Sequence, residues 1–296
     1  MRLDERARKL LRTGRIGMLA LATRRTPLVN PAVFWFGGDA VWMTTSRHAV
    51  KVAVARRRPA ASFLVEGGGH CVLLEGELEV FDPLSVPSDV RALFEGPGFF
   101  LNLAGYAWKN ADFIGGYLWD LARVPRDWWP HNRALLRLHA RRAWTLPSVA
   151  QSTAPAAEVD HVPPAIRRSL GREPVAYLCT LEDEAPLMAP GLWTSGEDDC
   201  LQLVTGVAGF LGISGRASGG VVIEYHHRYR ATRMVGVYMR GRFATDSGAK
   251  AAVRERYGLE EEPIGLGLRF RPDRVTWWRG FALETRTVVR EPAEKS

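Results

Sequence analysis

The chain contains the same sequence pattern twice, and this repeat limits its possible folds more than any other feature. When residue 15 is placed over residue 174, the two segments align without a gap at a constant offset of 159. Identical residues recur in order: Leu19 over Leu178, Pro27 over Pro186, Leu28 over Leu187, Pro31 over Pro190, Gly37 over Gly196 and Asp39 over Asp198. An ordered series of matches indicates an ancient duplication. We therefore expect the 296 residues to form two copies of one domain.

The boundary between the copies is predicted in a stretch rich in Pro, Ala and Ser, which reads LPSVAQSTAPAAEVDHVPPA. Proline removes a backbone donor and disrupts helices and central strands, so regular structure is not expected there. The predicted organisation is a first domain at 1–148, a linker at 149–164 and a second, degenerate domain at 165–296.

The first copy is predicted to consist mostly of strands. Apolar runs alternate with turn residues, and Gly37-Gly38-Asp39 marks a tight hairpin turn. The expected strands are 17–23, 28–36, 40–45, 61–66, 72–81 and 133–145, with helices at 46–57 and between about 87 and 121. Antiparallel strands with one short helix after the third favour a small closed barrel. The long aromatic insert before the last strand either covers a pocket or packs on the barrel.

The segment TTSRHAVK, residues 44–51, carries the main chemical signal. Ser46 is a good N-cap, which predicts a helix beginning at Arg47. The free N–H groups at a helix start attract anions. Arg47 and Lys51 are four residues apart and share one helix face, where like charges repel each other unless an anion lies between them. The pattern indicates a phosphate site, and a solvated basic helix face is the alternative.

The second copy lacks these cations. Here the offset is 160. Thr205 is retained at the place of Thr45, but Gly206, Val207 and Leu211 stand where the first copy has Ser46, Arg47 and Lys51. We therefore expect one phosphate site per chain.

The first copy resembles the pyridoxamine 5′-phosphate oxidase-like family of flavin-binding split β-barrels. The resemblance rests on the order of an apolar strand, a turn, a Pro-containing strand, an Asp/Gly turn and TTSRHAVK, over about residues 10–83. It is looser around 133–145, and the second copy is similar to the same fold more weakly. The fold class it implies is mainly β with inserted helices (α+β), arranged as two tandem split barrels that form a pseudo-dimer within one chain.

The family resemblance also implies a cofactor site. FMN, or alternatively the deazaflavin F420, would lie between two barrels. Its phosphate would be held by Thr45, Ser46, Arg47 and Lys51. The backbone of Asn30, Pro31, Ala32 and Val33 would run along the flavin ring. Since the full arginine and lysine set of pyridoxamine phosphate oxidases is not found, that particular activity is not expected.

Composition narrows the classes of partner. The net charge is +8, but it comes mostly from arginines spread along the chain, without a nucleic-acid-binding motif. The chain has no apolar run long enough for a membrane span and no secretion signal, so we expect a cytoplasmic protein that binds neither nucleic acid nor membrane. Three scattered cysteines predict no metal site and no disulfide framework.

The sequence therefore predicts an FMN-binding oxidoreductase acting on an unknown small molecule. In such proteins the cofactor supplies the redox chemistry, so no catalytic side chain is named. An F420-dependent oxidoreductase is one alternative, and a non-catalytic flavin- or haem-binding module is another. Because members of the family it resembles usually pair as dimers, the resemblance also leaves a homodimer of this chain open.

Overall fold

The computed structural model describes residues 3–82, 96–148 and 153–288. Its first half contains six strands, which are β1 (Ile16–Leu21), β2 (Leu28–Gly37), β3 (Ala40–Ser46), β4 (Ala60–Gly67), β5 (His70–Phe81) and β6 (Arg133–Pro147). Its helices are α1 (Glu5–Thr13), α2 (Val50–Arg57), α4 (Pro97–Lys109) and α5 (Ala111–Trp119), followed by the short 3-10 helices η1 (Leu121–Arg123), η2 (Arg126–Trp128) and η3 (Pro130–Asn132).

These six strands close into a barrel in the order β1-β2-β3-β6-β5-β4, so the predicted closed barrel is confirmed. The β2–β3 hairpin turns at Gly38 and Asp39, whose φ angles of 61° and 57° lie in the left-handed region. Asp is among the non-glycine residues that tolerate this conformation best, which explains its place in the turn. The predicted helical stretch before residue 96 lies largely outside the described residues.

The second half contains β7 (Ala176–Glu182), β8 (Ala185–Ser195), β9 (Leu201–Thr205), β10 (Ala217–Tyr225), β11 (Val235–Thr245), β12 (Leu266–Arg279) and β13 (Ala282–Thr287). Its helices are α6 (Pro164–Leu170), α7 (Ala249–Tyr257) and the 3-10 helix η4 (Ala231–Arg233). Because β11 also pairs with β12, six of these strands form a ring in the order β7-β8-β9-β12-β11-β10. This order repeats that of the first barrel, and β13 extends the ring at β12.

The two rings also share their strand register. Gly17 pairs with Ala32 in the first hairpin, and residues 159 positions later, Ala176 and Gly191, pair in the second. Because register decides which face of a strand each side chain occupies, the two copies place corresponding residues on corresponding faces. The shared order and register support the inferred duplication.

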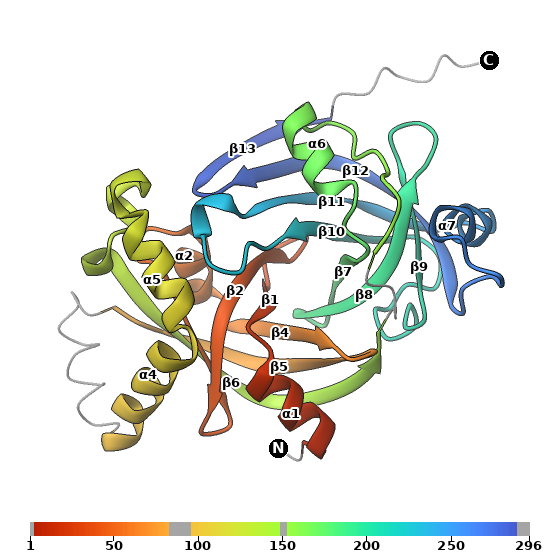
Figure 1. Cartoon of the computed structure of the whole chain (residues 1–296). Coiled ribbons are helices and arrows are strands. Elements are labelled where there is room, and N and C mark those ends of the chain that lie inside the picture. Colours follow the sequence, from red (N-terminus) through yellow and green to blue (C-terminus); the bar gives the residue numbers. More distant parts are fainter. Residues whose placement is uncertain (1–2, 83–95, 149–152, 289–296) are drawn as a thin grey trace.

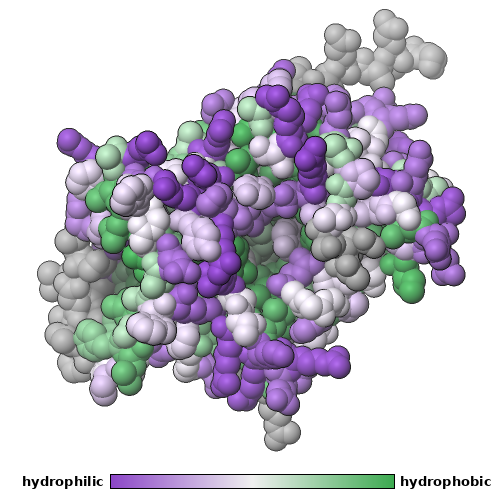
Figure 2. Space-filling view, in the orientation of Figure 1, coloured by the Kyte–Doolittle hydropathy of each residue, from purple (hydrophilic) through white to green (hydrophobic). Residues whose placement is uncertain are grey.

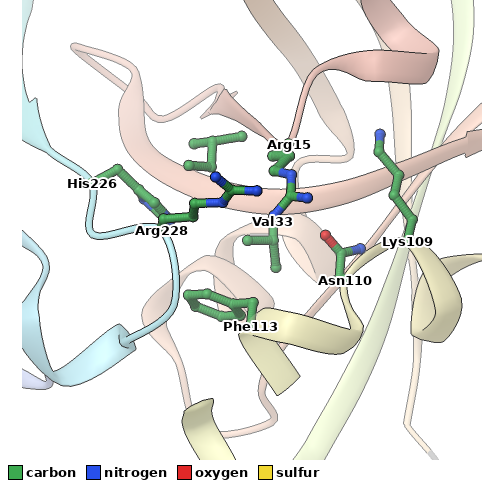
Figure 3. A pocket seen from close by; sticks show the side chains of 8 residues that line it. Arg15, Val33, Lys109, Asn110, Phe113, His226 and Arg228 are labelled. Carbon is green, nitrogen blue, oxygen red and sulfur yellow. The ribbon is translucent and has the colours of Figure 1, made fainter. Parts of the chain in front are cut away.

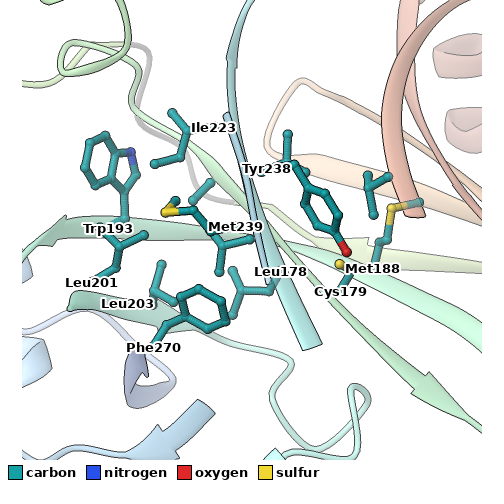
Figure 4. Packing of buried hydrophobic residues seen from close by; sticks show 14 of the residues in the cluster. Leu178, Cys179, Met188, Trp193, Leu201, Leu203, Ile223, Tyr238, Met239 and Phe270 are labelled. Atoms are coloured by element: carbon teal, nitrogen blue, oxygen red, sulfur yellow. The ribbon is translucent and has the colours of Figure 1, made fainter. Parts of the chain in front are cut away.

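The two halves are packed together through apolar side chains. One core cluster combines the inside of the second ring with Met18, Ala20, Leu64 and Leu73 of the first barrel. In Figure 4 Tyr238 and Met188 lie on the side of this cluster that faces the strands of the first half. The hydroxyl of Tyr238 donates a hydrogen bond to the carbonyl of Pro27. The barrels therefore form one packed body (Figure 1).

Each half inserts a helix between its fifth and sixth ring strands. In the first half α4 packs on β2 and β3, and in the second α7 packs on β8 and β9, the corresponding strands. The insert of the first half also reaches the second half, since α5 contacts η4. Figure 2 shows apolar side chains at the surface in the region of α4. Phe100, Leu101 and Trp108 of this helix are exposed.

The three cysteines, Cys71, Cys179 and Cys200, are buried and form no disulfide. Burial raises the pKa of Cys71 and of Cys179 to about 12, so neither thiol is reactive near neutral pH. Within the described residues, no helix is both long and apolar enough to cross a bilayer.

Candidate functional site

The turn from β3 to α2 differs from the sequence prediction. The prediction that Ser46 caps a helix beginning at Arg47 is wrong, because α2 begins at Val50 and its N-cap residue is Ala49. Strand pairing prevails over the capping signal: Ser46 is paired with Arg133 of β6, and the Arg47 N–H donates to the carbonyl of Asn132 at 2.8 Å.

The Ser46 hydroxyl is used within the protein. It accepts a hydrogen bond from the His48 N–H at 3.2 Å and donates one to the carbonyl of Asp127 at 2.5 Å. Ser46 therefore fastens the end of β3 to η2 of the insert. This leaves Ser46 as a support for the turn, with its hydroxyl occupied by neighbours.

Arg47 has its charge compensated. Its guanidinium forms an ion pair at 3.1 Å with Asp82, whose side chain is 3% exposed, and Arg56 pairs with the same carboxylate at 2.8 Å. The sequence does not reveal this link, because Asp82 follows β5 and only the closed barrel brings it beside α2. An anion near Arg47 must therefore compete with a buried carboxylate.

Thr45 points to the other side of β3. Strand side chains alternate between faces, and Val41 and Met43, on the Thr45 face, belong to the barrel core. Thr45 is buried and its hydroxyl oxygen has no hydrogen-bond partner. The neighbouring Thr44 faces the insert instead, and its hydroxyl meets that of Tyr106 at 2.9 Å.

Lys51 is the predicted cation that the structure leaves without an acid. Burial, with a further contribution from the Arg133 guanidinium, lowers the pKa of Lys51 to about 8. No carboxylate within the described residues forms an ion pair with it. An ammonium that is partly withdrawn from water in this way is costly unless an anion compensates it.

Arg133 is the site residue that sequence reasoning missed. It is the first residue of β6, and it donates to the Thr44 hydroxyl at 2.8 Å. Its guanidinium lies 5.6 Å from the ring centre of Tyr117 and 5.8 Å from that of Trp128. Burial lowers the pKa of Arg133, and within the described part of the chain it too has no carboxylate partner. Nothing in the local sequence marks Arg133. Its place opposite Ser46 becomes visible only when the pairing of β3 with β6 is known.

Lys51 and Arg133 together form what we call the cation pair. They lie near enough for Arg133 to depress the pKa of Lys51, and both are half-buried without a carboxylate partner among the described residues. Two such charges fit a phosphate, because each can donate a charge-assisted hydrogen bond to its oxygens. The insert partly covers the pair, since Tyr117 and Trp128 flank Arg133.

Asn30, Pro31, Ala32 and Val33 lie together on β2, as predicted. They pair with β1 from Asn30–Leu19 to Val33–Ile16, whereas β2 pairs with β3 only from Phe34 onward. Along this stretch β2 is therefore bonded to one described neighbour, which leaves its other side open to a ligand. All four residues are half-buried.

The corresponding place in the second half is filled by the protein. The Thr205 hydroxyl donates to the carbonyl of Pro190 at 3.0 Å, and Gly206 and Val207 lie in a turn where the first half continues toward α2. Leu211 is 1% exposed and belongs to the core. This half has an apolar plug where the first has Lys51.

Residues 4–96 match the family model of pyridoxamine 5′-phosphate oxidase. The match covers the first five barrel strands and both ends of the β3–α2 turn, so the resemblance found in the sequence is confirmed over this segment. No curated protein matches the chain closely enough to be a relative.

The chain is also similar to solved structures, each of which aligns with about half of it. General Stress Protein 26 from Bacillus anthracis is 17% identical, covers 50% of this chain and 97% of its own, and has a TM-score of 0.33. A FAD-binding protein from Mesorhizobium loti is 16% identical, and the alignment covers 50% of this chain and 96% of that protein, with a TM-score of 0.33. An F420 reductase is 19% identical, and the alignment covers 48% of this chain and 98% of that protein, with a TM-score of 0.31.

Proposed function

We propose that this chain is a flavin-dependent oxidoreductase that binds the phosphate of FMN at the cation pair, Lys51 and Arg133. The observation that carries the proposal is a pair of half-buried cations on one end of the barrel, neither of which has a carboxylate partner among the described residues. Such an arrangement destabilises the free protein, and a bound phosphate offsets that cost. The family match over residues 4–96 supports the same cofactor class.

The position of the cation pair agrees with the predicted ring site. Arg133 lies at the end of β6, opposite Ser46 on β3. The unpaired side of β2 at Asn30–Val33 belongs to the same barrel face, next to β3 in the ring. A flavin with its phosphate at the cation pair would extend its ring along this side of β2.

The protein and the cofactor divide the work. When bound, the flavin supplies the electron transfer, while the chain binds and orients it. Lys51 and Arg133 would hold the phosphate, and the insert residues Tyr106 and Tyr117 would limit access of water to it. Since Arg47 is already paired with Asp82, it would contribute less to binding than the sequence pattern indicates.

F420 is the second candidate cofactor. It carries a phosphate at the same place on its ribityl chain and continues into a longer acidic tail. The 35 arginines of the chain suit such a tail. A non-catalytic flavin- or haem-binding module is the third candidate, motivated by the apolar plug in the second half.

The test is a fluorescence titration of the purified full chain with FMN and, side by side, with F420. We expect a dissociation constant for FMN in the micromolar range. Lys51→Met and Arg133→Met should each weaken binding by about tenfold or more, the value of one charge-assisted hydrogen bond. Arg47→Met should weaken it less.

Lys9→Met is the matched control, because Lys9 lies exposed on α1 and its loss should leave the affinity unchanged. Tighter binding of F420 than of FMN would select the second candidate. Binding of neither, or equal binding by the wild type and both cation-pair variants, would refute the proposed site.

A further inference from the structure

A cavity lies between the first barrel, its insert and the second half. Its volume is about 130 Å³. Arg15 and Val33 come from the first barrel, Phe113 from α5, and His226 and Arg228 from the loop that joins β10 to β11. Figure 3 shows these side chains converging from the three parts of the chain. Neither Lys51 nor Arg133 lines this cavity, so it is separate from the cation pair.

The walls of the cavity carry excess positive charge. In Figure 3 the guanidinium groups of Arg15 and Arg228 reach toward each other above Val33. Arg15 has an exposed ion pair with Asp112 at 3.3 Å, whereas Arg228 forms no ion pair within the described residues. Lys109 also contributes to the wall, but its ammonium lies over the Phe34 ring and donates to the carbonyl of Leu11 at 3.3 Å, so the two arginines carry the charge that faces the cavity. Cations that face one another favour an anion between them.

A buried imidazole completes the polar side of the cavity. The side chain of His226 is 8% exposed, yet neither of its ring nitrogens has a hydrogen-bond partner. Its Nδ1 lies 3.8 Å from a carboxylate oxygen of Glu224, beyond hydrogen-bond distance but on that side of the ring. Nε2 is therefore the nitrogen left for a ligand. Buried polar atoms are almost always paired in folded proteins, so an orphaned imidazole on a cavity wall points to a ligand.

The remaining walls are apolar and fix the size of the ligand. Phe113 stacks on His226 with ring centres 5.8 Å apart, and Ile16 and Val33 form the adjoining surface. A cavity of about 150 Å³ lined by apolar groups accommodates benzene, so about 130 Å³ suits a compact apolar body of roughly that size. The walls combine an apolar surface with convergent donors.

We propose that this interbarrel cavity binds a compact organic carboxylate. The carboxylate would accept hydrogen bonds from Arg228 and from Nε2 of His226, and its apolar body would lie against Val33 and Phe113. The site does not rest on flavin binding. Because Val33 also belongs to the open side of β2, a carboxylate bound here would lie beside a flavin held by the first barrel.

The test is isothermal titration calorimetry of the full chain with benzoate, which combines a carboxylate with a benzene-sized body. We expect saturable binding in the millimolar range or tighter. Benzamide has the same shape without the charge, and it should bind at least tenfold more weakly. Inorganic phosphate is the third probe, and tighter binding of phosphate than of benzoate would overturn the assignment of an organic ligand.

Two variants locate the ligand. Arg228→Gln and His226→Gln should each reduce benzoate affinity about tenfold, whereas Arg242→Gln, at an exposed arginine on β11, should not change it. Arg228 is exposed, so its replacement should not impair folding. It therefore tests the site even if the buried His226→Gln variant fails to fold. Unchanged benzoate affinity in Arg228→Gln would overturn the proposal. Lys51→Met separates the two sites, because it should weaken FMN binding and leave benzoate binding intact.

Discussion

The guanidinium of Arg256 lies 4.0 Å from the ring centre of Trp193. The first half repeats this arrangement with different residues, since the ammonium of Lys109 lies 4.0 Å from the ring centre of Phe34. Phe34 and Trp193 are 159 positions apart, as the repeat requires. Each cation comes from the inserted helix and also donates to a backbone carbonyl, that of Leu11 in the last turn of α1 in one half and that of Gly171 just after α6 in the other.

We predict that Arg256→Leu destabilises the fold more than Lys109→Met. Arg256 donates to the carbonyls of Gly171 at 2.7 Å and Pro155 at 3.2 Å, and to that of Trp193, so its loss leaves several buried acceptors unpaired. We expect a loss of about 3 kcal/mol in the free energy of unfolding. Lys109→Met removes one cation–π contact and one hydrogen bond, for a loss of about 1 kcal/mol. Urea denaturation measures both, and equal losses would contradict the prediction.

A second prediction uses two adjacent glycines of α5. A Cβ at Gly116 would lie 1.8 Å from the carbonyl oxygen of Tyr229, whereas a Cβ at Gly115 meets nothing within 4 Å. Gly116→Ala should therefore push α5 off the second half and cost about 2 kcal/mol or more. Gly115→Ala should stabilise the protein by about 0.5–1 kcal/mol, because alanine favours the helix. Thermal unfolding of the two variants distinguishes them, and a shift of the same sign in both would refute this packing.

Asp120 provides a third prediction, about acid sensitivity. Its buried carboxylate accepts hydrogen bonds from Arg230 and Thr232, both at 2.6 Å, and so joins the insert to the second half. The hydrogen bond from Thr232, with the neighbouring arginines, lowers the pKa of Asp120. A lowered pKa in the folded state means that the stabilisation is present above the ordinary pKa, about 3.9, and is lost as the pH falls below it.

Asp120→Asn should accordingly cost about 1–3 kcal/mol at pH 7. The difference from the wild type should shrink as the pH is lowered toward 3. Denaturation curves at pH 7, 5 and 3.5 measure it. A difference that stays constant over this range would show that the charge of Asp120 does not contribute.

The repeat and the turn chemistry predicted most of the fold. The β2–β3 hairpin and the closed barrel follow from apolar runs and from Gly38-Asp39, and these are local signals. The start of α2 could not be predicted, because the pairing of Ser46 with Arg133 links residues far apart in sequence. The same pairing places Arg133 at the site, and closure of the barrel brings Asp82, which follows β5, to Arg47. Neither contact can be predicted from local sequence.

The interbarrel cavity shows the same limit. In the sequence, the adjacent residues His226 and His227 raise the question of a metal site. If they lay on a strand, their side chains would point to opposite faces and would not bind one metal together. The structure places both beyond the end of β10, in a loop, and brings only His226 to the cavity wall. Within the described residues no three His, Cys, Asp or Glu side chains form a metal-binding group. Packing between the two halves creates this site, and no pattern within one half indicates it.

A final prediction concerns the pH dependence of FMN binding. Burial and Arg133 lower the pKa of Lys51 to about 8 in the free protein, and a phosphate beside it would raise that pKa again. Below pH 8 Lys51 is already charged, so the affinity should be constant. Above pH 8 binding must take up a proton, and at pH 9 the affinity should be roughly tenfold weaker than at pH 7.

Lys51→Met should bind FMN more weakly and lose this pH dependence. Lys109→Met should retain it, although the pKa of Lys109 is also about 8, because Lys109 lies outside the cation pair. Fluorescence titrations at pH 7, 8 and 9 decide, and an unchanged pH dependence in Lys51→Met would exclude Lys51 as the group that titrates.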